Sequence, residues 1–556
     1  MNKKYVYLVI LLLLIASCAA FGRIAGHDFI NFDDDMYITQ NHYIQQGITS
    51  ASIRWAFKNF LSTNWHPVTW ISIMLDWSIF ESNASGYHIV NLLIHIGASI
   101  FLFLFLLKTT NNLYLSAFAV IYFTLHPLRV ESVAWASQRK DVLSMFFGMT
   151  CLYAYSLYAE NLKFSRYLLC LALLTLSLMS KATFITMPFI LLLIDYWPLK
   201  RFQVLSGSGF RASDILLMEK IPFFILSIIS GIMTVWAQIE TSVIHMDFPM
   251  RVTNAIVSYV LYLKKIFLPV DLAVFYPFEL SFPSAQILGS VVILLCLTVL
   301  AIYYVKRLPF FFVGWFWYLG TLVPVSGLVS INAPMADRYT YLPSIGIAIM
   351  LAWGIPALVN SEQIRGKILF PMAIVVLSIL AFLTWRQCGY WKNSITLFSH
   401  TLHVTQNNDL ALNNLANALL DEGQNIEAIN HYNKAITINQ KSDLLYYNRG
   451  NAYIKTGQYQ LAINDYHNAI NLKPDNMIVY NNRGIAWAAL HEYRKAIEDF
   501  TSAISINKNY ADAYNNRGLT YFNQRKKESG CRDVRKACEL GNCRGLELAK
   551  SMGLCP

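Results

Sequence analysis

Charged residues are scarce in this chain: Asp, Glu, Lys and Arg make up only 14% of its 556 residues. Hydrophobic residues reach 55%, and the mean hydropathy is +0.40. An ordinary soluble domain carries about a quarter charged residues, so this composition argues against a wholly soluble protein. We expect most of the chain to lie in a lipid bilayer.

Several enzyme motifs are also absent. The sequence has no Gly-rich phosphate-binding loop, no HExxH and no GxSxG, so it gives no support to the nucleotide-binding, zinc-peptidase or serine-hydrolase chemistry that those motifs carry. The net charge of +11 is spread over membrane edges and repeats. It forms no aromatic-interleaved basic patch, which argues against nucleic-acid binding.

Eleven apolar runs approach the ~20 residues needed to cross a hydrocarbon core about 30 Å thick. These runs are Tyr5–Ala20, His88–Leu107, Leu113–Leu125, Val142–Tyr158, Tyr167–Ser180, Ala182–Trp197, Ile221–Trp236, Ala285–Val305, Pro309–Val329, Leu342–Leu358 and Ile368–Trp385. The expected fold class is all-α, a polytopic membrane protein with about eleven transmembrane helices.

Lysine and arginine fall on alternate connections between these runs, and positive residues are retained in the cytoplasm. This cytoplasmic set is Lys3, Lys4, Lys108, Lys163, Arg166, Lys200, Arg201, Lys306, Arg307, Arg365 and Lys367. Residues 22–87, 126–140, 241–283, 331–341 and the C-terminus are then predicted outside an inner membrane. The run 251–268, which ends in Lys264 and Lys265, conflicts with this count, so we interpret it as an interfacial helix.

Cysteines give two further indications. Ile15-Ala16-Ser17-Cys18 resembles a lipoprotein cleavage box, so lipidation of Cys18 stays open beside an uncleaved first span. Four cysteines crowd into the last 26 residues, on the predicted outer side, where disulfides persist. They are Cys531, Cys538, Cys543 and Cys555. Three pairings are open, and a zinc site is the weaker alternative because no CxxC pair occurs.

From Asn408 the sequence becomes polar and repeats every 34 residues, as Ala416, Gly450, Gly484 and Gly518 show. That period is typical of the tetratricopeptide repeat. The second unit matches its pattern with Tyr446, Gly450, Tyr453, Ala462, Tyr466, Ala469 and Pro474. We predict a membrane domain over 1–390, a linker over 391–407, about four repeats over 408–543 stacked as an α-solenoid, and a cysteine-rich cap over 530–556.

Asparagines keep the same period, at Asn414, Asn448, Asn482 and Asn516. An amide side chain both donates to and accepts from a peptide backbone. In this repeat class the position lines the concave groove, so the row resembles the peptide-holding asparagines of some repeat-bearing glycosyltransferases. The alternative is that these residues only solvate the superhelix or start its helices, and the sequence leaves both open.

Three adjacent carboxylates, Asp33, Asp34 and Asp35, follow the first apolar run. Carboxylates this close raise each other's pKa, and they persist where a cation, a base or a reacting proton needs them. A solvated turn with helix capping is the structural alternative.

The chain resembles the GT-C class of glycosyltransferases and, more closely, the transmembrane and tetratricopeptide-repeat protein O-mannosyltransferases and their bacterial relatives. The segments that carry this resemblance are residues 31–34, 65–70, 126–135, 139–143, 195–198 and 336–343, together with the repeats. The resemblance implies a polyprenyl-phosphate sugar donor and an acceptor hydroxyl, expected on a protein held by the repeats. It also implies that the acidic pair Asp33 and Asp34 supplies the base, while Asp35 binds a cation or caps the following turn.

The chemistry of sugar transfer predicts roles for other residues. A departing lipid phosphate calls for cations, for which Arg338 is best placed, with Arg139 and Lys140 as second candidates. His126, Glu131, His66 and Tyr339 are expected to shape the acceptor side or support these groups. Snorkelling arginine and helix-end histidine are the structural alternatives.

The predicted function is transfer of a sugar from a polyprenyl-phosphate donor to an extracytoplasmic hydroxyl, with Ser or Thr of a protein as acceptor. Two alternatives remain: a non-catalytic membrane scaffold for envelope assembly, and a lipid or glycan acceptor. No cofactor is required by the sequence, and a divalent cation stays open. The sequence leaves the sugar and the oligomeric state unassigned.

Overall fold

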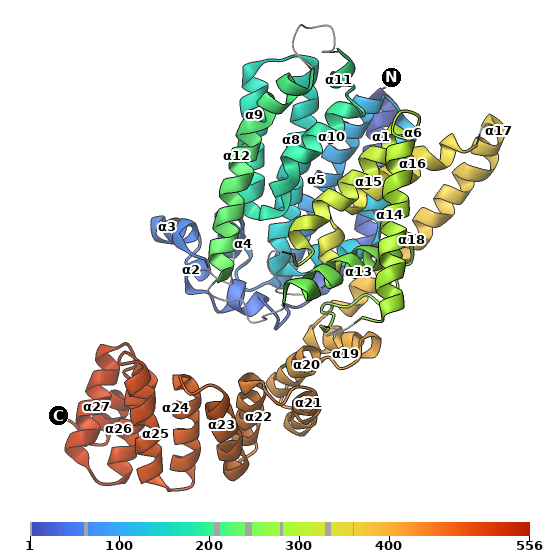
Figure 1. Ribbon diagram of the computed structural model, residues 1–556. Helices are drawn as coiled ribbons and strands as arrows, with labels where there is room; N and C mark the ends of the chain where they lie inside the picture. The colour runs from blue at the N-terminus through green and yellow to red at the C-terminus, as the bar shows by residue number, and fades with distance from the viewer. Residues whose placement is uncertain are drawn as a thin grey trace. The chain divides into compact units, whose positions relative to one another are not determined.

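The computed structural model describes residues 3–60, 65–204, 212–239, 247–278, 282–328, 335–359 and 361–556. These residues form helices joined by turns and loops, and no strand occurs among them. The chain divides into two compact units, Met1–Thr405 and Gln406–Pro556 (Figure 1). The predicted all-α class is confirmed.

The first unit contains nineteen α-helices among its described residues. They are α1 (Lys3–Phe21), α2 (His42–Gln45), α3 (Ser50–Lys58), α4 (Pro67–Phe80), α5 (Ala84–Thr110), α6 (Leu113–Thr124), α7 (Val130–Ala134), α8 (Arg139–Glu160), α9 (Phe164–Ser180), α10 (Met187–Tyr196), α11 (Arg201–Val204), α12 (Ala212–Ile239), α13 (Phe248–Phe267), α14 (Ser284–Tyr303), α15 (Pro309–Leu322), α16 (Ser344–Ala357), α17 (Glu362–Ile364), α18 (Phe370–Tyr390) and α19 (Ser394–Val404).

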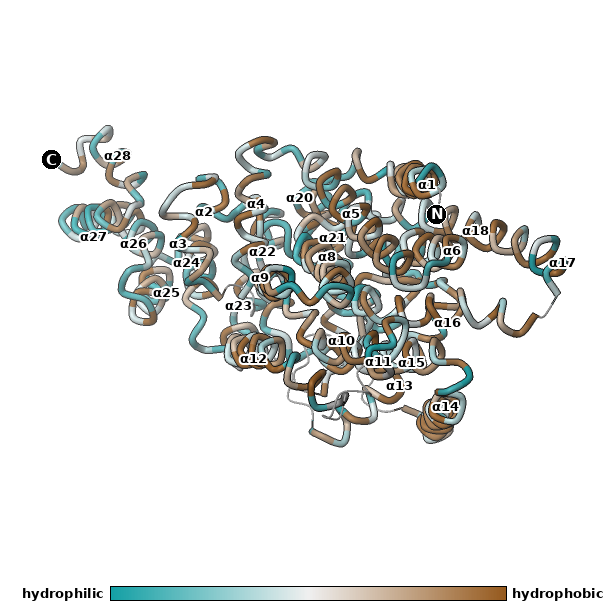
Figure 2. Tube along the Cα trace, turned by 90° about the horizontal axis from the view of Figure 1, so that it is seen from above, coloured by the Kyte–Doolittle hydropathy of each residue, from teal (hydrophilic) through white to brown (hydrophobic). Residues whose placement is uncertain are grey.

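Six of the described helical segments are long and apolar enough to cross a membrane, and a seventh arises if the bent pair Leu113–Thr124 and Pro127–Ala134 counts as one span. Figure 2 shows the apolar character of α12, α14 and α18. Four other predicted spans coincide with shorter apolar helices: Phe164–Ser180, Ala182–Tyr196, Pro309–Val325 and Ser344–Ala357. The described residues thus indicate a multi-pass membrane protein with six candidate spans by length and composition, fewer than the eleven predicted.

Asparagines set the ends of the first long hairpin. The Asn83 side chain accepts a hydrogen bond from the Ser85 N–H at the start of α5. Asn111 ends α5 in the left-handed conformation with φ 51°, which Asn tolerates better than most residues. Asn112 then caps α6 by accepting from the Leu115 N–H. Local sequence therefore accounts for the sharp reversal between these two helices.

Helix α13 is not among the six candidate spans. One of its faces packs into the apolar cluster that contains Tyr262, Trp315 and Tyr318. The Tyr259 hydroxyl donates to the Leu319 carbonyl at 2.9 Å. Our interpretation of this segment as an interfacial helix stays a prediction.

The segment predicted as a linker, 391–407, contains α19. The first loop meets this helix, since the Asn31 N–H donates to the Ser394 hydroxyl at 2.9 Å and the rings of Phe32 and Phe398 lie 6.0 Å apart. Helix α19 therefore belongs to the first compact unit, and it helps to hold the acidic loop.

The second unit is a stack of helix pairs. Its helices are α20 (Asp409–Asp421), α21 (Asn425–Ile438), α22 (Asp443–Lys455), α23 (Tyr459–Leu472), α24 (Met477–Ala489), α25 (Tyr493–Ile506), α26 (Ala511–Asn523), α27 (Lys527–Glu539) and α28 (Arg544–Ser551). The repeat glycines lie against large side chains: a Cβ at Gly450 would come within 2.7 Å of the Tyr466 ring, and one at Gly484 within 2.7 Å of the Phe500 ring. Glycine at these positions therefore lets the paired helices approach closely.

Two disulfides close the C-terminal end. Cys531 pairs with Cys555, and Cys538 pairs with Cys543. The first pair joins α27 to the last residues of the chain, where Val534 and Ala549 form a small apolar cluster with it. The structure thus selects one of the three pairings that the sequence left open.

Candidate functional site

Asp34 is fully buried and anchors the acidic loop. Its carboxylate accepts from the Ile30 N–H at 2.9 Å and from the Ser137 N–H at 2.8 Å. Burial raises the pKa of Asp34 to about 7, and the two backbone donors oppose this rise. A carboxylate with both oxygens engaged by backbone is a structural element, so Asp34 holds the loop against the turn before α8.

Asp33 points to a different environment, although it is the adjacent residue. Its side chain is 31% exposed, and one carboxylate oxygen lies 3.8 Å from the Lys140 Nζ. Burial in its surroundings raises the pKa of Asp33, while the positive charges of Lys140 and Arg338 pull it back. Asp33 is therefore the member of the pair that is accessible to a ligand.

Lys140 is held in place by an aromatic residue of the first loop. Its ammonium lies 4.4 Å from the centre of the Tyr37 ring and 3.3 Å from the Tyr37 hydroxyl. His66 stacks on the same ring, with 5.6 Å between ring centres. Burial lowers the pKa of His66 well below its usual range, and Lys140 and Lys181 add to this effect. His66 therefore stays neutral beneath the cations.

The Asp35 carboxylate accepts from the N–H of the next residue, Met36, at 2.8 Å. Asp35 is the first residue of the short helical turn Asp35–Thr39, which has no side-chain cap. Within the described parts of the chain, no group of three or more His, Cys, Asp or Glu residues is arranged to hold a metal ion. Cation binding by Asp35 stays a prediction.

Arg338 and Glu131 form an ion pair, although 207 positions separate them in the sequence. Glu131 also accepts from the Arg338 backbone N–H at 2.7 Å. Burial alone would lower the pKa of the Arg338 guanidinium, but Glu131 beside it raises that pKa above its usual range. The guanidinium lies 5.2 Å from the centre of the Tyr339 ring, and the supporting role of Tyr339 stays a prediction.

A second ion pair, which sequence reasoning missed, lies next to the first. Lys181, directly after α9, is 2.5 Å from Asp141 in the first turn of α8. Ser132 donates to the other oxygen of Asp141 at 3.3 Å. One signal was available: Lys181 is a basic residue between two apolar runs, on the side opposite the cytoplasmic set.

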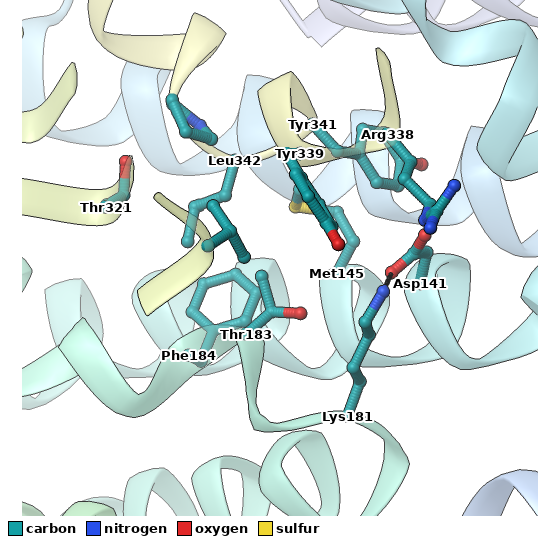
Figure 3. A pocket seen from close by; sticks show the side chains of 12 residues that line it. Asp141, Met145, Lys181, Thr183, Phe184, Thr321, Arg338, Tyr339, Tyr341 and Leu342 are labelled. Atoms are coloured by element: carbon teal, nitrogen blue, oxygen red, sulfur yellow. Dashed lines mark hydrogen bonds and ion pairs between the residues drawn. The ribbon is translucent and has the colours of Figure 1, made fainter. Parts of the chain in front are cut away.

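Arg338 of the first pair and both members of the second pair lie at one end of a narrow pocket. Figure 3 shows Lys181, Asp141 and Arg338 grouped together, with Phe184, Thr321 and Leu342 farther along the pocket. The full lining is Asp141, Met145, Lys181, Thr183, Phe184, Thr321, Val325, Arg338, Tyr339, Tyr341, Leu342 and Pro343. The pocket therefore combines a cationic end with mostly apolar walls.

Arg139, predicted as a phosphate ligand, is placed elsewhere. Its guanidinium is fully buried, with 2.5 Å to the Asp76 carboxylate, 2.5 Å to the Asn91 side chain and 2.8 Å to the Ser72 hydroxyl. These bonds tie α8 to α4 and α5. A buried pair is costly to break, so the structure assigns Arg139 to packing instead of phosphate binding.

His126, predicted to shape the acceptor side, also turns away from this cluster. One ring nitrogen lies 2.9 Å from the Ile266 carbonyl, and the other accepts from the Leu128 N–H at 3.2 Å. Both nitrogens are thus used by the backbone. This is the helix-end role that was the alternative interpretation.

Three asparagines of the row donate hydrogen bonds to other asparagines in the preceding repeat. Asn448 donates to Asn413 at 2.8 Å, Asn482 to Asn451 at 3.0 Å, and Asn516 to Asn481 at 3.0 Å. Asn414 donates within its own helix, to the Leu410 carbonyl. These hydrogen bonds between side-chain amides link the first helices of successive repeats. The row therefore has a structural use, and its peptide-binding role stays a prediction.

The comparisons with known proteins agree with both halves of the chain. A family model described as a TPR repeat matches residues 416–457, 450–490 and 488–524. A protein O-mannosyl-transferase from Caenorhabditis elegans is 23% identical over 450 residues, which cover 77% of this chain and 62% of that relative. The protein O-mannosyl-transferase TMTC1 from Homo sapiens is 23% identical over 485 residues, covering 76% of this chain and 54% of the relative.

Among solved structures, a crystal structure of MamA is 27% identical and covers 26% of this chain and 85% of its own, with a TM-score of 0.26. The chain spans less than two thirds of the length of the two O-mannosyl-transferase relatives. The chain is similar to the TMTC-type protein O-mannosyl-transferases, at about 23% identity over most of its length, and it has tetratricopeptide repeats in its C-terminal region.

Proposed function

We propose that this chain transfers a sugar, mannosyl by analogy with the names of its homologues, from a polyprenyl phosphate to a Ser or Thr hydroxyl of an extracytoplasmic protein. One observation carries the proposal. The accessible carboxylate of Asp33 lies within the field of three cations, Lys140, Arg338 and Lys181. Two of those cations line a pocket with mostly apolar walls.

Asp33 is the base in this proposal. The acceptor hydroxyl oxygen forms a bond to the anomeric carbon, and its proton passes to the Asp33 carboxylate. The bond from that carbon to the phosphate oxygen breaks, and the electron pair leaves with the lipid phosphate. Attack from the side opposite the leaving group inverts the anomeric centre. Asp34 assists by fixing the loop, not by taking the proton.

The cations of the pocket stabilise the charge that develops on the lipid phosphate. Lys181 and Arg338 stand at its polar end, while Phe184, Leu342 and Met145 offer apolar contact for the first part of an isoprenoid chain. Glu131 keeps Arg338 charged and oriented. Lys140, next to Asp33, connects the cationic end to the base.

The pocket has a volume of about 20 Å³, which is room for a water molecule and less than a phosphate needs. Its polar end is closed by the pair between Lys181 and Asp141. Donor binding therefore requires this pair to part, with the phosphate replacing Asp141 as the partner of Lys181. A charged ligand can do so because it forms charge-assisted hydrogen bonds with the same cation.

The remaining features of the proposal concern placement. We infer eleven spans in an inner membrane, with the domain boundaries given above, and with the first loop and the repeats on the outer side. Alternating basic connections support this orientation. The two disulfides support it as well, because such bonds persist in oxidising compartments. The repeats would then hold the protein acceptor on the same side of the membrane as the first loop.

The test uses the full chain in lipid nanodiscs with labelled polyprenyl-phosphate mannose and a Ser/Thr-rich acceptor protein. Replacing Asp33 by Asn should lower transfer by about a hundredfold or more, the contribution of a positioned base. Asp35→Asn is the matched control, since the Asp35 carboxylate accepts from the adjacent Met36 N–H, and it should keep parental activity. Transfer by the Asp33→Asn variant at the parental rate would refute the assignment.

Removal of residues 406–556 separates donor binding from acceptor binding. The truncated chain should still bind the labelled donor but lose transfer to protein. If transfer to protein persists, the repeats do not hold the acceptor. If donor binding is absent in the parent as well, the membrane domain is a scaffold and not an enzyme.

A further inference from the structure

A hollow of about 410 Å³ lies between α23 and α24, in the repeat unit and apart from the asparagine row. It is lined by Gln460, Ile463, Asn464, His467, Asn468, Arg483 and Trp487. Arg483 and Trp487 are four positions apart on α24 and so share one face of that helix. Asn482 of the asparagine row is rotated from Arg483 by about 100°. The hollow is thus a separate surface from the predicted peptide groove.

The neighbouring repeats fill the equivalent position with protein contacts. Arg449 donates through Nη1 to Asn433, and Arg517 donates through Nη1 to Thr501, in each case to a residue 16 positions earlier. The equivalent residue for Arg483 is His467. Among the described residues, neither the Nη1 of Arg483 nor the His467 ring has a hydrogen-bond partner. One hydrogen bond, which joins the arginine to the preceding helix in the two neighbouring repeats, is therefore missing here.

A second periodic position changes in the same place. Trp487 occupies the position of Tyr453 and Tyr521, which are 34 residues before and after it. The indole presents a larger apolar surface to the hollow than a phenol ring would. His467 and Trp487 both line the hollow, so the two departures from the repeat pattern meet at one site.

The charge of the hollow is balanced. The Nε and Nη2 of Arg483 donate to the Asp499 carboxylate at 2.8 and 2.7 Å. The guanidinium is thereby neutralised, and its remaining N–H groups act as neutral donors rather than as an anion site. Gln460, Asn464 and Asn468 add amide donors and acceptors. The Lys495 ammonium lies 4.4 Å from the centre of the Trp487 ring and is paired with Glu492 at 3.5 Å. Among the described residues, a phosphate or an acidic peptide would therefore find no uncompensated cation at this hollow.

We propose that this hollow binds a neutral sugar. A hexose presents an apolar C–H face, which fits against an indole, and a ring of hydroxyls, which pair with amides, an imidazole and guanidinium N–H groups. The volume accommodates one or two hexose units. The inference does not depend on transfer activity, because the site lies in the repeat unit and needs no donor phosphate.

The test measures binding of methyl α-mannoside to the purified full chain by saturation-transfer NMR and titration. Trp487→Ala should weaken binding about tenfold, the loss of one aromatic contact. His467→Asn should weaken it as well, because asparagine engages the Arg483 Nη1 as Asn433 engages Arg449. Thr501→Asn, at the same position of the next repeat, is the control and should leave binding unchanged.

Three results would overturn the proposal. The first is no detectable binding of mannoside, glucoside or N-acetylglucosaminide to the parent chain. The second is binding that neither His467→Asn nor Trp487→Ala weakens, which would place the sugar in the membrane domain. The third is that an unglycosylated Ser/Thr-rich peptide, and no sugar, loses binding in these variants, which would make the hollow a peptide site.

Discussion

Asp33 and Asp34 are adjacent in the chain but have opposite surroundings. Asp34 is enclosed and bound by two backbone N–H groups, whereas Asp33 is partly exposed and faces Lys140. Successive residues in a turn point in different directions, so one serves the loop and the other serves the pocket. The acidic pair is thus one anchor and one candidate base.

Asp34 makes the stability of the folded protein depend on pH. Its pKa is about 7 in the folded chain and about 3.9 in an unfolded one. The group's stabilising contribution is therefore complete below the unfolded value and is lost as pH rises through about 7. Thermal unfolding measured at about pH 5 and about pH 8 should show the parent less stable at the higher pH.

Asp34→Asn should lose this part of the pH dependence. The amide retains one acceptor oxygen, so one of the two backbone donors is left unpaired, at a cost of about 1–3 kcal/mol. A variant that is as stable as the parent and keeps the same pH profile would contradict the anchoring role of Asp34.

Lys181 should govern donor affinity. Lys181→Gln removes one charge-assisted contact, worth about 1.5–3 kcal/mol, which corresponds to a rise of roughly 10–100-fold in the donor KM. Lys181→Arg should keep most of the affinity. Lys163→Gln, at the other end of α9, is the control. Steady-state kinetics with the labelled donor provides the measurement, and an unchanged KM in Lys181→Gln would remove Lys181 from the site.

At the scale of elements, helices are joined by two kinds of contact. In the membrane unit, long-range polar pairs connect helices, such as Arg139 with Asp76 between α8 and α4. In the repeat unit, small residues admit an aromatic from the partner helix, and an Arg–Asp pair recurs in each of the last three repeats. The repeat contacts are local in sequence, so each helix pair has nearly the same geometry.

Gly484 tests this local packing. A methyl group there would lie 2.7 Å from a Phe500 ring carbon, so Gly484→Ala should destabilise the third helix pair by about 1–3 kcal/mol. Hydrogen exchange of α24 and α25 in the intact chain is the measurement. Adding Phe500→Leu should restore part of the lost stability, because the two residues are in contact. Independent, additive effects of the two changes would exclude a direct clash.

At the scale of the whole molecule, the predicted membrane topology is consistent with the positions of the charged residues. Basic residues in the short connections cluster on one predicted side, whereas Lys181 lies on the other side next to Asp141. The acidic loop belongs to the first compact unit, whereas the repeats form a second compact unit of their own. Relatives named as protein O-mannosyl-transferases are similar to this chain over about three quarters of its length.

The predicted orientation can be tested through the C-terminal cysteines. If the repeats lie in an oxidising compartment, Cys531 and Cys555 should form a disulfide in the protein isolated from cells. Alkylation before reduction should then not label these two cysteines. Mass spectrometry of peptides with and without reduction gives the answer, and full labelling without reduction would place the C-terminus in the cytoplasm. Cys531→Ser should also loosen the cap by about 3 kcal/mol, the expected value for a loop of 24 residues.

Local patterns predicted a large part of this protein. Apolar run length predicted the helices of the membrane unit, and the 34-residue period predicted the helix pairs down to the glycines that admit Tyr466 and Phe500. These features depend on neighbours along the chain, so they can be read from it. The acidic loop and Arg338 were found because charges are rare in an apolar sequence.

What the sequence by itself determined is the helical class, the repeat register and the short set of residues able to do chemistry in an apolar setting. Only the tertiary structure decided which of them meet. It pairs Glu131 with Arg338, which is 207 positions away in the sequence, and it pairs Lys181 with Asp141. It also gives Arg139 and His126 packing roles. The reason is physical: a charge buried in an apolar environment must find a partner, and distant helices supply that partner only after they pack.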